Sequence, residues 1–194
     1  NTTQINLPSS KIYGSIPIEI SYLTKLTHLA LNANFLEGEI PAEIGNLKNL
    51  VFLDLSHNRE IKGNIPPEIG KISTLEQLYL NHTNLSGSIP ISIFYLTKLS
   101  HLGLSNNNLH GSIPFEINEL KNLQYLNLSD NNLDGLIPSQ ICQLTNLLHL
   151  NLSSNNLYGK IPKEITRLRN LETIGLFNNM LEGEIPKGIQ NLKT

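Results

Sequence analysis

Histidine is the residue type with the widest chemical capacity in this 194-residue chain, which contains six copies of it. An imidazole can ligate a metal, transfer a proton, or change its charge in the mildly acidic range. Five of the six occupy polar positions between regularly spaced leucines: His28, His57, His82, His101 and His149. The first question is therefore which of these three kinds of chemistry the surrounding residues support.

Metal binding and catalysis both lack the partners they would need. A zinc site takes three or four ligands in tetrahedral geometry. His57 and His82 occupy equivalent positions in adjacent repeats, where neighbouring strands would place them about 5 Å apart, and Asp54 is close in sequence. No convincing fourth ligand, cysteine pair, paired acids or Gly-rich phosphate loop accompanies them. The sequence predicts no enzyme activity, no metal and no cofactor, and exposed histidines favour pH-dependent binding instead.

Aromatic residues near the middle of the chain suggest a binding face. Phe52, Tyr79 and Tyr125 share the histidines' type of position, and exposed aromatics at the centre of an interface carry much of its binding energy. An alternative stays open, because strands favour aromatics that simply pack on their neighbours. The expected ligand-binding set is Phe52, Asp54, His57, Tyr79, His82, His101, Tyr125 and His149.

Five Asn-x-Ser/Thr motifs are candidate acceptors for N-linked glycans: Asn1, Asn81, Asn84, Asn127 and Asn151. With 26 Asn and 27 Ser plus Thr in the chain, chance alone gives roughly four such motifs. The count therefore proves nothing about secretion. Asn127 and Ser129, two residues apart, are expected on one exposed strand face. Glycans on Asn127 and Asn151 would confine ligand binding to the earlier repeats.

The regular spacing of glycine and proline shows that the chain is built of sequence repeats, and these repeats must position the residues above. Eight glycines are each followed three residues later by a proline, at a spacing of 24 residues with one step of 25. The unit reads L-x-x-L-x-L-x-x-N-x-L-x-G-x-I-P-x-x-I-x-x-L-x-x. The extra residue falls in SHNREIKGNIP, near Arg59 and Glu60, where a bulge onto the rim is expected. Fixed periods of this size indicate a solenoid.

Each part of the unit predicts a local structure. L-x-x-L-x-L places leucines on one face of a short strand, and stacked copies form a parallel sheet. The Asn column can satisfy main-chain groups of its own and adjacent coils. The following Gly suggests a backbone that other residues adopt at a cost. Pro after Ile begins a short helical turn, often with Glu two residues on. The Asn column comprises Asn34, Asn58, Asn107, Asn131, Asn155 and Asn179, with Ser10 and Thr83 as exceptions.

Composition narrows the class of partner. The net charge is −2, from 14 basic and 16 acidic residues, which gives no reason to expect nucleic acid or an anionic membrane. No apolar run approaches the roughly 20 residues that span a bilayer. Cys142 is the single cysteine, so it has no partner for an internal disulfide, and its mixed column is expected to face solvent.

The segment after the repeat Asn resembles a known family. LEGEIP at 36–41 and 181–186, NLSGSIP at 84–90 and NLHGSIP at 108–114 are similar to the plant-specific class of extracellular leucine-rich repeat, and the resemblance covers essentially the whole chain. It implies an α/β solenoid with a concave parallel β-sheet, a second short sheet, 3₁₀ turns on the convex side and little regular α-helix.

The resemblance also implies a domain organisation. Residues 1–194 are expected to form a single leucine-rich repeat domain of eight 24-residue repeats, one with a one-residue insertion, without the cysteine caps usual in the family. The chain is interpreted as an internal portion of a longer ectodomain, or as a capless product that buries its ends by stacking. Terminal repeats need a polar outer face, yet apolar residues are expected to face water at the two ends: Ile5, Leu7, Ile16, Ile174, Leu176 and Ile185.

By resemblance, the expected function is extracellular recognition by a plant receptor-like kinase or receptor-like protein. The concave face or rim would bind a peptide or protein ligand, and possibly a co-receptor, in the apoplast, with the full-length protein tethered to the plasma membrane. No nucleic acid is expected as a partner, and no membrane contact by this segment. The alternative is a secreted inhibitor of microbial cell-wall-degrading enzymes, similar to polygalacturonase-inhibiting proteins. Ice binding is a weaker alternative, because the sheet columns mix aromatic residues and His with Asn and Ser.

Arginines depart from the pattern of some peptide-sensing members of the family, which hold a terminal carboxylate with two arginines from the sheet face. Here Arg59 is expected at the rim, and Arg167 and Arg169 on the convex side. The ligand is therefore expected to differ, or its anchoring coils to lie outside this chain.

Overall fold

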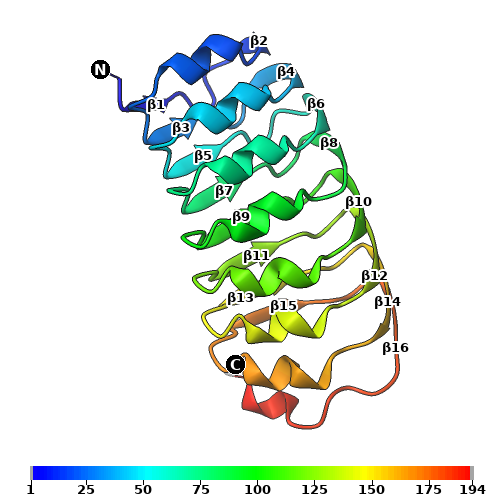
Figure 1. Cartoon of the computed structure of the whole chain (residues 1–194). Helices are drawn as coiled ribbons and strands as arrows, with labels where there is room; N and C mark the ends of the chain where they lie inside the picture. Colours follow the sequence, from blue (N-terminus) through cyan, green and yellow to red (C-terminus); the bar gives the residue numbers. More distant parts are fainter. Residues whose placement is uncertain (1, 193–194) are drawn as a thin grey trace.

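The computed structural model describes residues 2–192 and shows a stack of coils, each with two short strands and one 3₁₀ turn (Figure 1). The two families of strands form separate, wholly parallel sheets of eight strands each. No α-helix occurs among the described residues. The expected solenoid, with two sheets and 3₁₀ turns, is confirmed.

The first sheet is the concave one, and each of its three-residue strands has an apolar repeat residue at its centre, as Leu29 in His28–Ala30, between two variable residues. Equivalent repeat positions pair directly, as in His28↔Phe52 and Tyr125↔His149. This register stacks like positions into columns across the sheet. The strands are β1 (Gln4–Asn6), β3 (His28–Ala30), β5 (Phe52–Asp54), β7 (Gln77–Tyr79), β9 (His101–Gly103), β11 (Tyr125–Asn127), β13 (His149–Asn151) and β15 (Thr173–Gly175).

The second sheet begins where each coil turns away from the first. Its repeat glycines, from Gly14 to Gly183, have φ between 76° and 88°, a left-handed conformation that is strained for other residues. The strands are β2 (Tyr13–Ser15), β4 (Phe35–Glu39), β6 (Glu60–Asn64), β8 (Asn84–Gly87), β10 (Asn108–Ser112), β12 (Asn132–Leu136), β14 (Asn156–Lys160) and β16 (Met180–Glu182).

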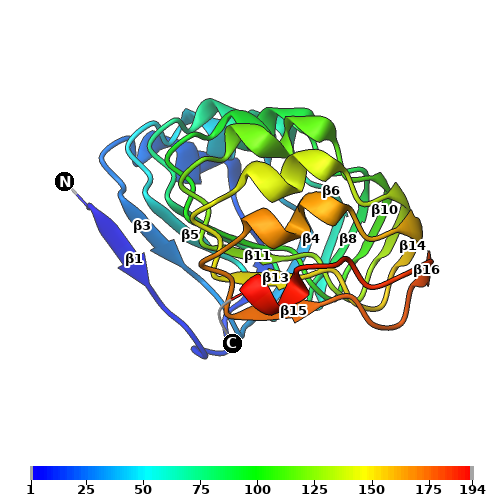
Figure 2. The same cartoon turned by 90° about the horizontal axis from the view of Figure 1, so that it is seen from below.

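The 3₁₀ turns cover the third side of the stack. In most coils a proline precedes the turn as its N-cap, because its fixed φ suits entry into a helical turn. The view along the solenoid (Figure 2) shows the turns opposite the concave sheet and the second sheet at the side. The turns are η1 (Ile18–Tyr22), η2 (Ala42–Asn46), η3 (Pro67–Lys71), η4 (Ile91–Tyr95), η5 (Phe115–Glu119), η6 (Ser139–Gln143), η7 (Lys163–Arg167) and η8 (Ile189–Asn191).

The repeat leucines and isoleucines fill the space between these three sides as one continuous cluster, from Ile16 to Leu192. The end residues only partly follow the expectation. Leu7, Ile174 and Ile185 are exposed, and Ile5 and Leu176 pack partly against the core. The expectation for Ile16 was wrong: it is 5% exposed, because the following coil covers this position.

The repeat asparagines form a buried hydrogen-bond ladder, as expected. Asn131 donates to the carbonyls of Leu104, Leu128 and Ser129, and its Oδ1 accepts the N–H of Leu109, at 2.9–3.2 Å. Each amide thus links its own coil to the preceding one. The carbonyls are shared, since Asn107 also donates to Leu104 O, so the coils are joined without interruption.

The inserted residue and the Thr83 exception are structurally related. In the coil with the insertion, Ile61 N–H donates to Asn58 O within its own coil at 3.1 Å. It therefore needs no Asn Oδ1 from the next coil, and that coil carries Thr83 instead. The Thr83 hydroxyl donates to Asn107 Oδ1 at 2.6 Å. It thereby connects the coil that lacks a repeat Asn to the hydrogen-bond ladder of the next coil.

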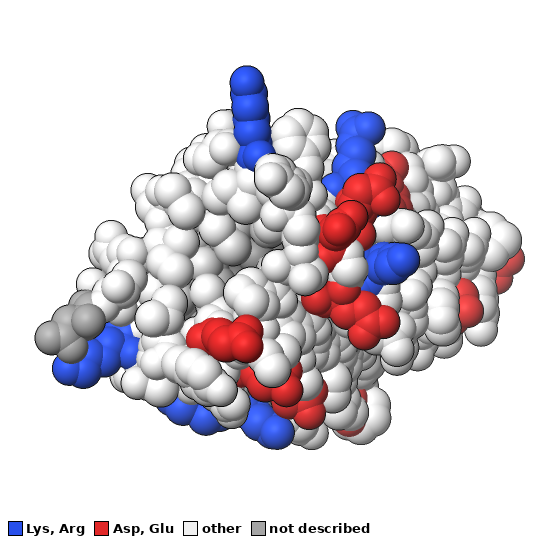
Figure 3. Space-filling view, turned by 90° about the horizontal axis from the view of Figure 1, so that it is seen from above, with Lys and Arg blue, Asp and Glu red and all other residues white. Residues whose placement is uncertain are grey.

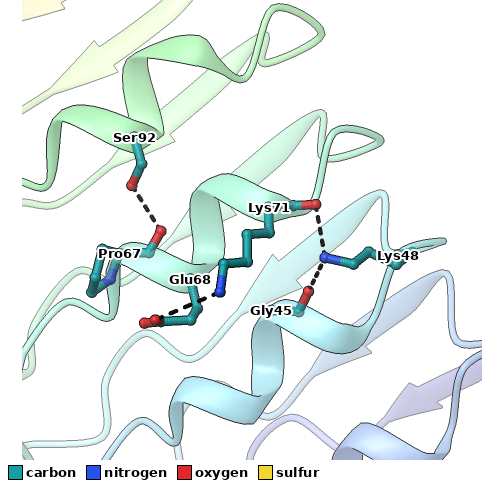
Figure 4. A network of polar contacts seen from close by, with 6 residues as sticks. All are labelled: Gly45, Lys48, Pro67, Glu68, Lys71 and Ser92. Atoms are coloured by element: carbon teal, nitrogen blue, oxygen red, sulfur yellow. Dashed lines mark hydrogen bonds and ion pairs between the residues drawn. The ribbon is translucent and has the colours of Figure 1, made fainter.

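Polar contacts also connect the convex turns (Figure 4). Lys48 Nζ donates to the carbonyls of Gly45 at 2.6 Å and Lys71 at 3.2 Å, bridging η2 and η3. The Ser92 hydroxyl donates to Pro67 O at 2.7 Å, bridging η3 and η4. A second set of asparagines, not anticipated from the sequence, donates to carbonyls of the preceding coil at 2.7–2.9 Å: Asn49, Asn122, Asn146 and Asn170.

Cys142 on η6 does not face solvent as expected. Its side chain is fully buried, and burial raises the pKa of its thiol to about 12. Phe94 occupies the same column and is also fully buried. The column points inward between adjacent turns, so its mixed composition reflects variable space rather than exposure.

Candidate recognition face

Six rings from successive strands stack along the concave sheet, and we call them the aromatic ladder. Their centroids are 6.0–6.3 Å apart at each of the five steps. Two of the five steps, His28–Phe52 and His101–Tyr125, are stacked, and the other three are tilted by 52–61°. Every member is half-buried. The ladder comprises His28, Phe52, Tyr79, His101, Tyr125 and His149.

Strand register explains most of the ladder. His28, Phe52, His101, Tyr125 and His149 lie in one column of paired positions. Tyr79 comes from the neighbouring column, since its paired partners are Asp54 and Gly103, and its ring completes the stack.

Gly103 makes the position of Tyr79 possible. A Cβ on Gly103 would lie 3.0 Å from Tyr79 Cδ1 and 2.6 Å from Asn81 Nδ2. Both side chains lean over the backbone of Gly103, which has no side chain to obstruct them. The glycine is therefore a local requirement of the ladder.

Hydroxyl groups set the tautomers of two ladder histidines. The Thr27 hydroxyl donates to Thr3 O and also contacts His28 Nδ1, each at 2.9 Å. Ser100 likewise donates to Glu76 O at 3.0 Å and contacts His101 Nδ1 at 2.9 Å. Because each hydroxyl has one hydrogen, Nδ1–H donates to it. Neutral His28 and His101 therefore present Nε2 as a hydrogen-bond acceptor.

Burial and neighbouring charges shift several groups of the face. Burial, with a smaller effect of His149, lowers the pKa of His101, which favours its neutral form. Burial, followed by Tyr125 and Asp54, raises the pKa of Tyr79, so its hydroxyl stays protonated and able to donate. The ladder thus offers both acceptors and donors along an otherwise apolar row.

The remaining predicted residues do not all join the ladder. Asp54 lies beside it, and its Oδ1 accepts the N–H and hydroxyl of Ser56 at 2.9 and 2.6 Å. His57 and His82 form a separate stacked pair just beyond the strand ends, with centroids 4.3 Å apart. His149 Nε2 lies 3.8 Å from the Glu172 carboxylate.

Sequence reasoning missed two features of this face. His28 was not in the expected ligand-binding set, although its column matches that of Phe52. A shallow hollow at the N-terminal end of the ladder is lined by Asn6, Pro8, His28, Ala30, Asn32 and Phe52. The small Ala30 side chain in that column was the available sequence signal.

The glycan motifs occupy different environments. Asn1 lies outside the described residues. Asn84 on the second sheet is exposed, while Asn81, Asn127 and Asn151 are half-buried on the concave side. Ser129 does not share the exposed face as expected: it is 4% exposed, because β11 ends at Asn127 and the strand alternation ends with it.

Metal-binding potential and charge distribution are two further properties of the described residues. No group of three or more His, Cys, Asp or Glu side chains is placed to hold a metal ion there. Viewed from the N-terminal end (Figure 3), acidic side chains gather in clusters and basic side chains stand apart from one another. Residues 2–192 contain no helical segment with the length and hydropathy of a transmembrane span.

Solved structures of plant receptors share this fold. The ectodomain of the Arabidopsis receptor kinase HAESA, in complex with the peptide hormone IDA and the co-receptor SERK1, matches with a TM-score of 0.92 and 41% identity over 95% of this chain and 30% of that chain. A TDR receptor matches with a TM-score of 0.94 and 36% identity, over 97% of this chain and 33% of the other.

The ectodomain of GASSHO1/SCHENGEN3 from Arabidopsis thaliana, in complex with CASPARIAN STRIP INTEGRITY FACTOR 2, matches with a TM-score of 0.89 and 38% identity. That match covers 92% of this chain and 21% of the other. The chain thus spans between about a fifth and a third of the length of these receptor chains. A comparison with curated protein sequences found no match.

Family models agree with the structural matches. A model described as a leucine-rich repeat region matches residues 91–194. A second, described as a leucine rich repeat, matches residues 25–47, 49–72 and 74–96. The chain belongs to the leucine-rich repeat family.

Proposed function

We propose that this chain is part of the extracellular ectodomain of a plant receptor-like kinase or receptor-like protein, and that it binds an extended peptide across the aromatic ladder. The observation that carries this proposal is the ladder itself. Five steps of about 6 Å give a length of about 30 Å, which equals roughly nine residues of extended chain.

The chemistry of the ladder suits an extended main chain. Neighbouring rings pack against one another along the sheet, so a ligand meets their free edges. Those edges carry Nε2 of His28 and His101 and the hydroxyls of Tyr79 and Tyr125. An extended peptide exposes N–H and C=O groups that need such partners, and the hollow beside Phe52 has room for one of its side chains.

The titles of the matched structures support this class of ligand. HAESA binds a peptide hormone together with a co-receptor, and GASSHO1/SCHENGEN3 is in complex with CASPARIAN STRIP INTEGRITY FACTOR 2. By this likeness the partners of our chain are a peptide or protein ligand and a co-receptor, and its location is the apoplast, with the full-length protein tethered to the plasma membrane. The single continuous core supports one domain, and we propose that this domain is non-catalytic.

We further propose Asn84 as the glycan acceptor that leaves the face free. The Asn84 Oδ1 accepts a hydrogen bond from Asn108 Nδ2, so Asn84 Nδ2 is the atom directed to solvent. By contrast, Asn127 Nδ2 donates to the Tyr125 hydroxyl at 3.2 Å, and both Asn127 and Asn151 are half-buried on the concave side. Intact-mass measurement of secreted protein and of Asn84→Gln tests this assignment; unchanged glycan mass would overturn it.

Alanine substitutions with matched controls test ligand binding. Synthetic peptides of about nine to twelve residues, and a microbial polygalacturonase, would be screened for binding to the secreted protein. Phe52→Ala and Tyr125→Ala are expected to weaken binding of a peptide hit at least about tenfold, since central aromatics carry interface energy. Phe115→Ala and Tyr95→Ala remove exposed aromatics of the convex turns and are expected to have no effect.

Two outcomes would contradict the proposal. Equal losses from concave and convex substitutions would show that the ladder is not the binding face. Binding of the polygalacturonase alone, with no peptide hit, would favour the secreted inhibitor instead.

A further inference from the structure

The stacked pair of His57 and His82 lies at the end of the concave sheet and takes no part in the aromatic ladder. Both residues have left-handed backbones, with φ of 57° and 53°. Main-chain bonds fix their positions, because His57 N–H donates to Asn81 O at 2.8 Å and His82 N–H to Ser105 O at 2.9 Å. The rings lie 4.3 Å apart and are inclined by 16°.

Positive charge converges on this pair. Arg59 follows His57 by two residues, within the coil that carries the inserted residue, and its side chain is exposed. In the described part of the chain the Arg59 guanidinium has no carboxylate within ion-pair distance. Two imidazoles and one guanidinium therefore gather at this end of the sheet, and Asp130 is the carboxylate that acts on His82 there.

The charged neighbours of His82 are known. Burial lowers the pKa of His82 first, then the nearness of His57 and of Arg59, while Asp130 opposes the shift. In the same column the flanking residues are Ala33 and Asn106, and neither is titratable. Asp54, on the adjoining strand, is occupied by Ser56.

We propose that His57, His82 and Arg59 form a binding site for a carboxylate of the ligand. The inference rests on the proposed function and adds the charge of the ligand to it. A carboxylate beside the pair would accept charge-assisted hydrogen bonds from the guanidinium and from a protonated imidazole. The carboxylate belongs either to a peptide terminus or to an acidic side chain, since both present the same two oxygens.

Proton linkage gives this site a pH dependence with a definite sign. Without a ligand, burial and the nearby His57 and Arg59 lower the pKa of His82 and disfavour its protonated form. A bound carboxylate favours the protonated form of His82 and raises its pKa, so binding takes up a proton. Affinity for a carboxylate therefore rises as the pH falls from about 7.5 to about 5.5.

Three blocked tripeptides serve as probes: acetyl-Gly-Gly-Gly with a free carboxylate, acetyl-Gly-Asp-Gly-amide and acetyl-Gly-Gly-Gly-amide. Histidine NMR titrations would report the pKa of His82 with each probe. The expected result is a rise of at least about half a unit with one or both carboxylate probes and none with the neutral one. Which carboxylate probe acts identifies the source of the group.

Variants locate the effect. His57→Asn keeps a residue suited to the left-handed backbone, since Asn106 and Asn178 occupy the same column with φ of 55°. His57→Asn and Arg59→Gln are expected to lower affinity for the carboxylate probes at least about fivefold at about pH 5.5. His110→Asn, which removes the exposed histidine of the second sheet, and Arg169→Gln serve as controls and are expected to change nothing.

Equal binding of carboxylate and neutral probes would overturn the proposal, and so would an affinity that His57→Asn and Arg59→Gln leave unchanged. The probes are about 10 Å long, too short to span the ladder. Failure of this site would therefore leave the ladder test with Phe52→Ala and Phe115→Ala unaffected.

Discussion

Replacing Asn131 by Ala tests how the coils are held together. Its amide makes four buried hydrogen bonds. The loss in stability differs between them, because some partner groups keep another hydrogen bond and one does not. The three carbonyls that accept from Asn131 each keep another donor. Leu104 O still accepts from Asn107 Nδ2, and Leu128 O still accepts from Asn155 Nδ2. Ser129 O still accepts from the N–H of Asn106. The group left without its bond to Oδ1 is the N–H of Leu109.

The expected magnitude follows from that group. An orphaned buried donor costs about 1–3 kcal/mol, and the net loss of the remaining hydrogen bonds adds about 1 kcal/mol. Asn131→Ala should therefore lower the free energy of unfolding by about 2–4 kcal/mol, which corresponds to a fall in Tm of roughly 5–15 °C. Asn132→Ala, the adjacent exposed residue, should change stability by less than about 0.5 kcal/mol.

Calorimetry gives the Tm, and native-state hydrogen exchange measures the protection of the Leu109 amide directly. In a solenoid each coil contacts only its neighbours, so the exchange measurement is local and complements the global transition. Equal stability of Asn131→Ala and Asn132→Ala, or an unchanged exchange rate at Leu109, would refute the role given to the asparagine hydrogen-bond ladder.

Three further predictions concern the core and the concave face. Gly103→Ala places a Cβ 3.0 Å from Tyr79 Cδ1 and should displace the ring, seen as a loss of NMR contacts between Tyr79 and His101; intact contacts would argue against it. Cys142, with a pKa of about 12, should resist a thiol reagent at about pH 8 until the protein unfolds, and rapid labelling of the native protein would disagree. Because the folded-state pKa of His101 is lowered, the unfolded chain binds its proton first as pH falls below about 6.5, so stability declines there. His101→Gln should show a smaller fall in Tm between about pH 7 and pH 5 than the native sequence, and an equal fall would contradict the assignment.

Sequence periodicity predicts the fold because residues at the same repeat position have the same structural role in most coils. The leucines are core, the asparagines bind main-chain groups, and the column spacing of about 5 Å for His57 and His82 is close to the 4.3 Å between their rings. Such columns follow from strand register alone, which a fixed repeat length sets.

Other features depend on contacts between coils that no repeat position encodes. Cys142 is buried because adjacent 3₁₀ turns leave space beneath it, and nothing in its mixed column indicates that space. The orientation of the His28 ring depends on the Thr27 hydroxyl, which is itself committed to Thr3 O in the preceding coil. Tyr79 enters the ladder from a different column through the space above Gly103.

The position of a bound peptide on the ladder tests the central claim most directly. Intermolecular NOEs would be measured between a peptide found by the screen and the ring protons of His28 and His149, which lie at opposite ends of the ladder. The account predicts contacts from one end of the peptide to His28 and from the other end to His149. Contacts confined to Tyr95 and Phe115 on the convex turns would contradict it.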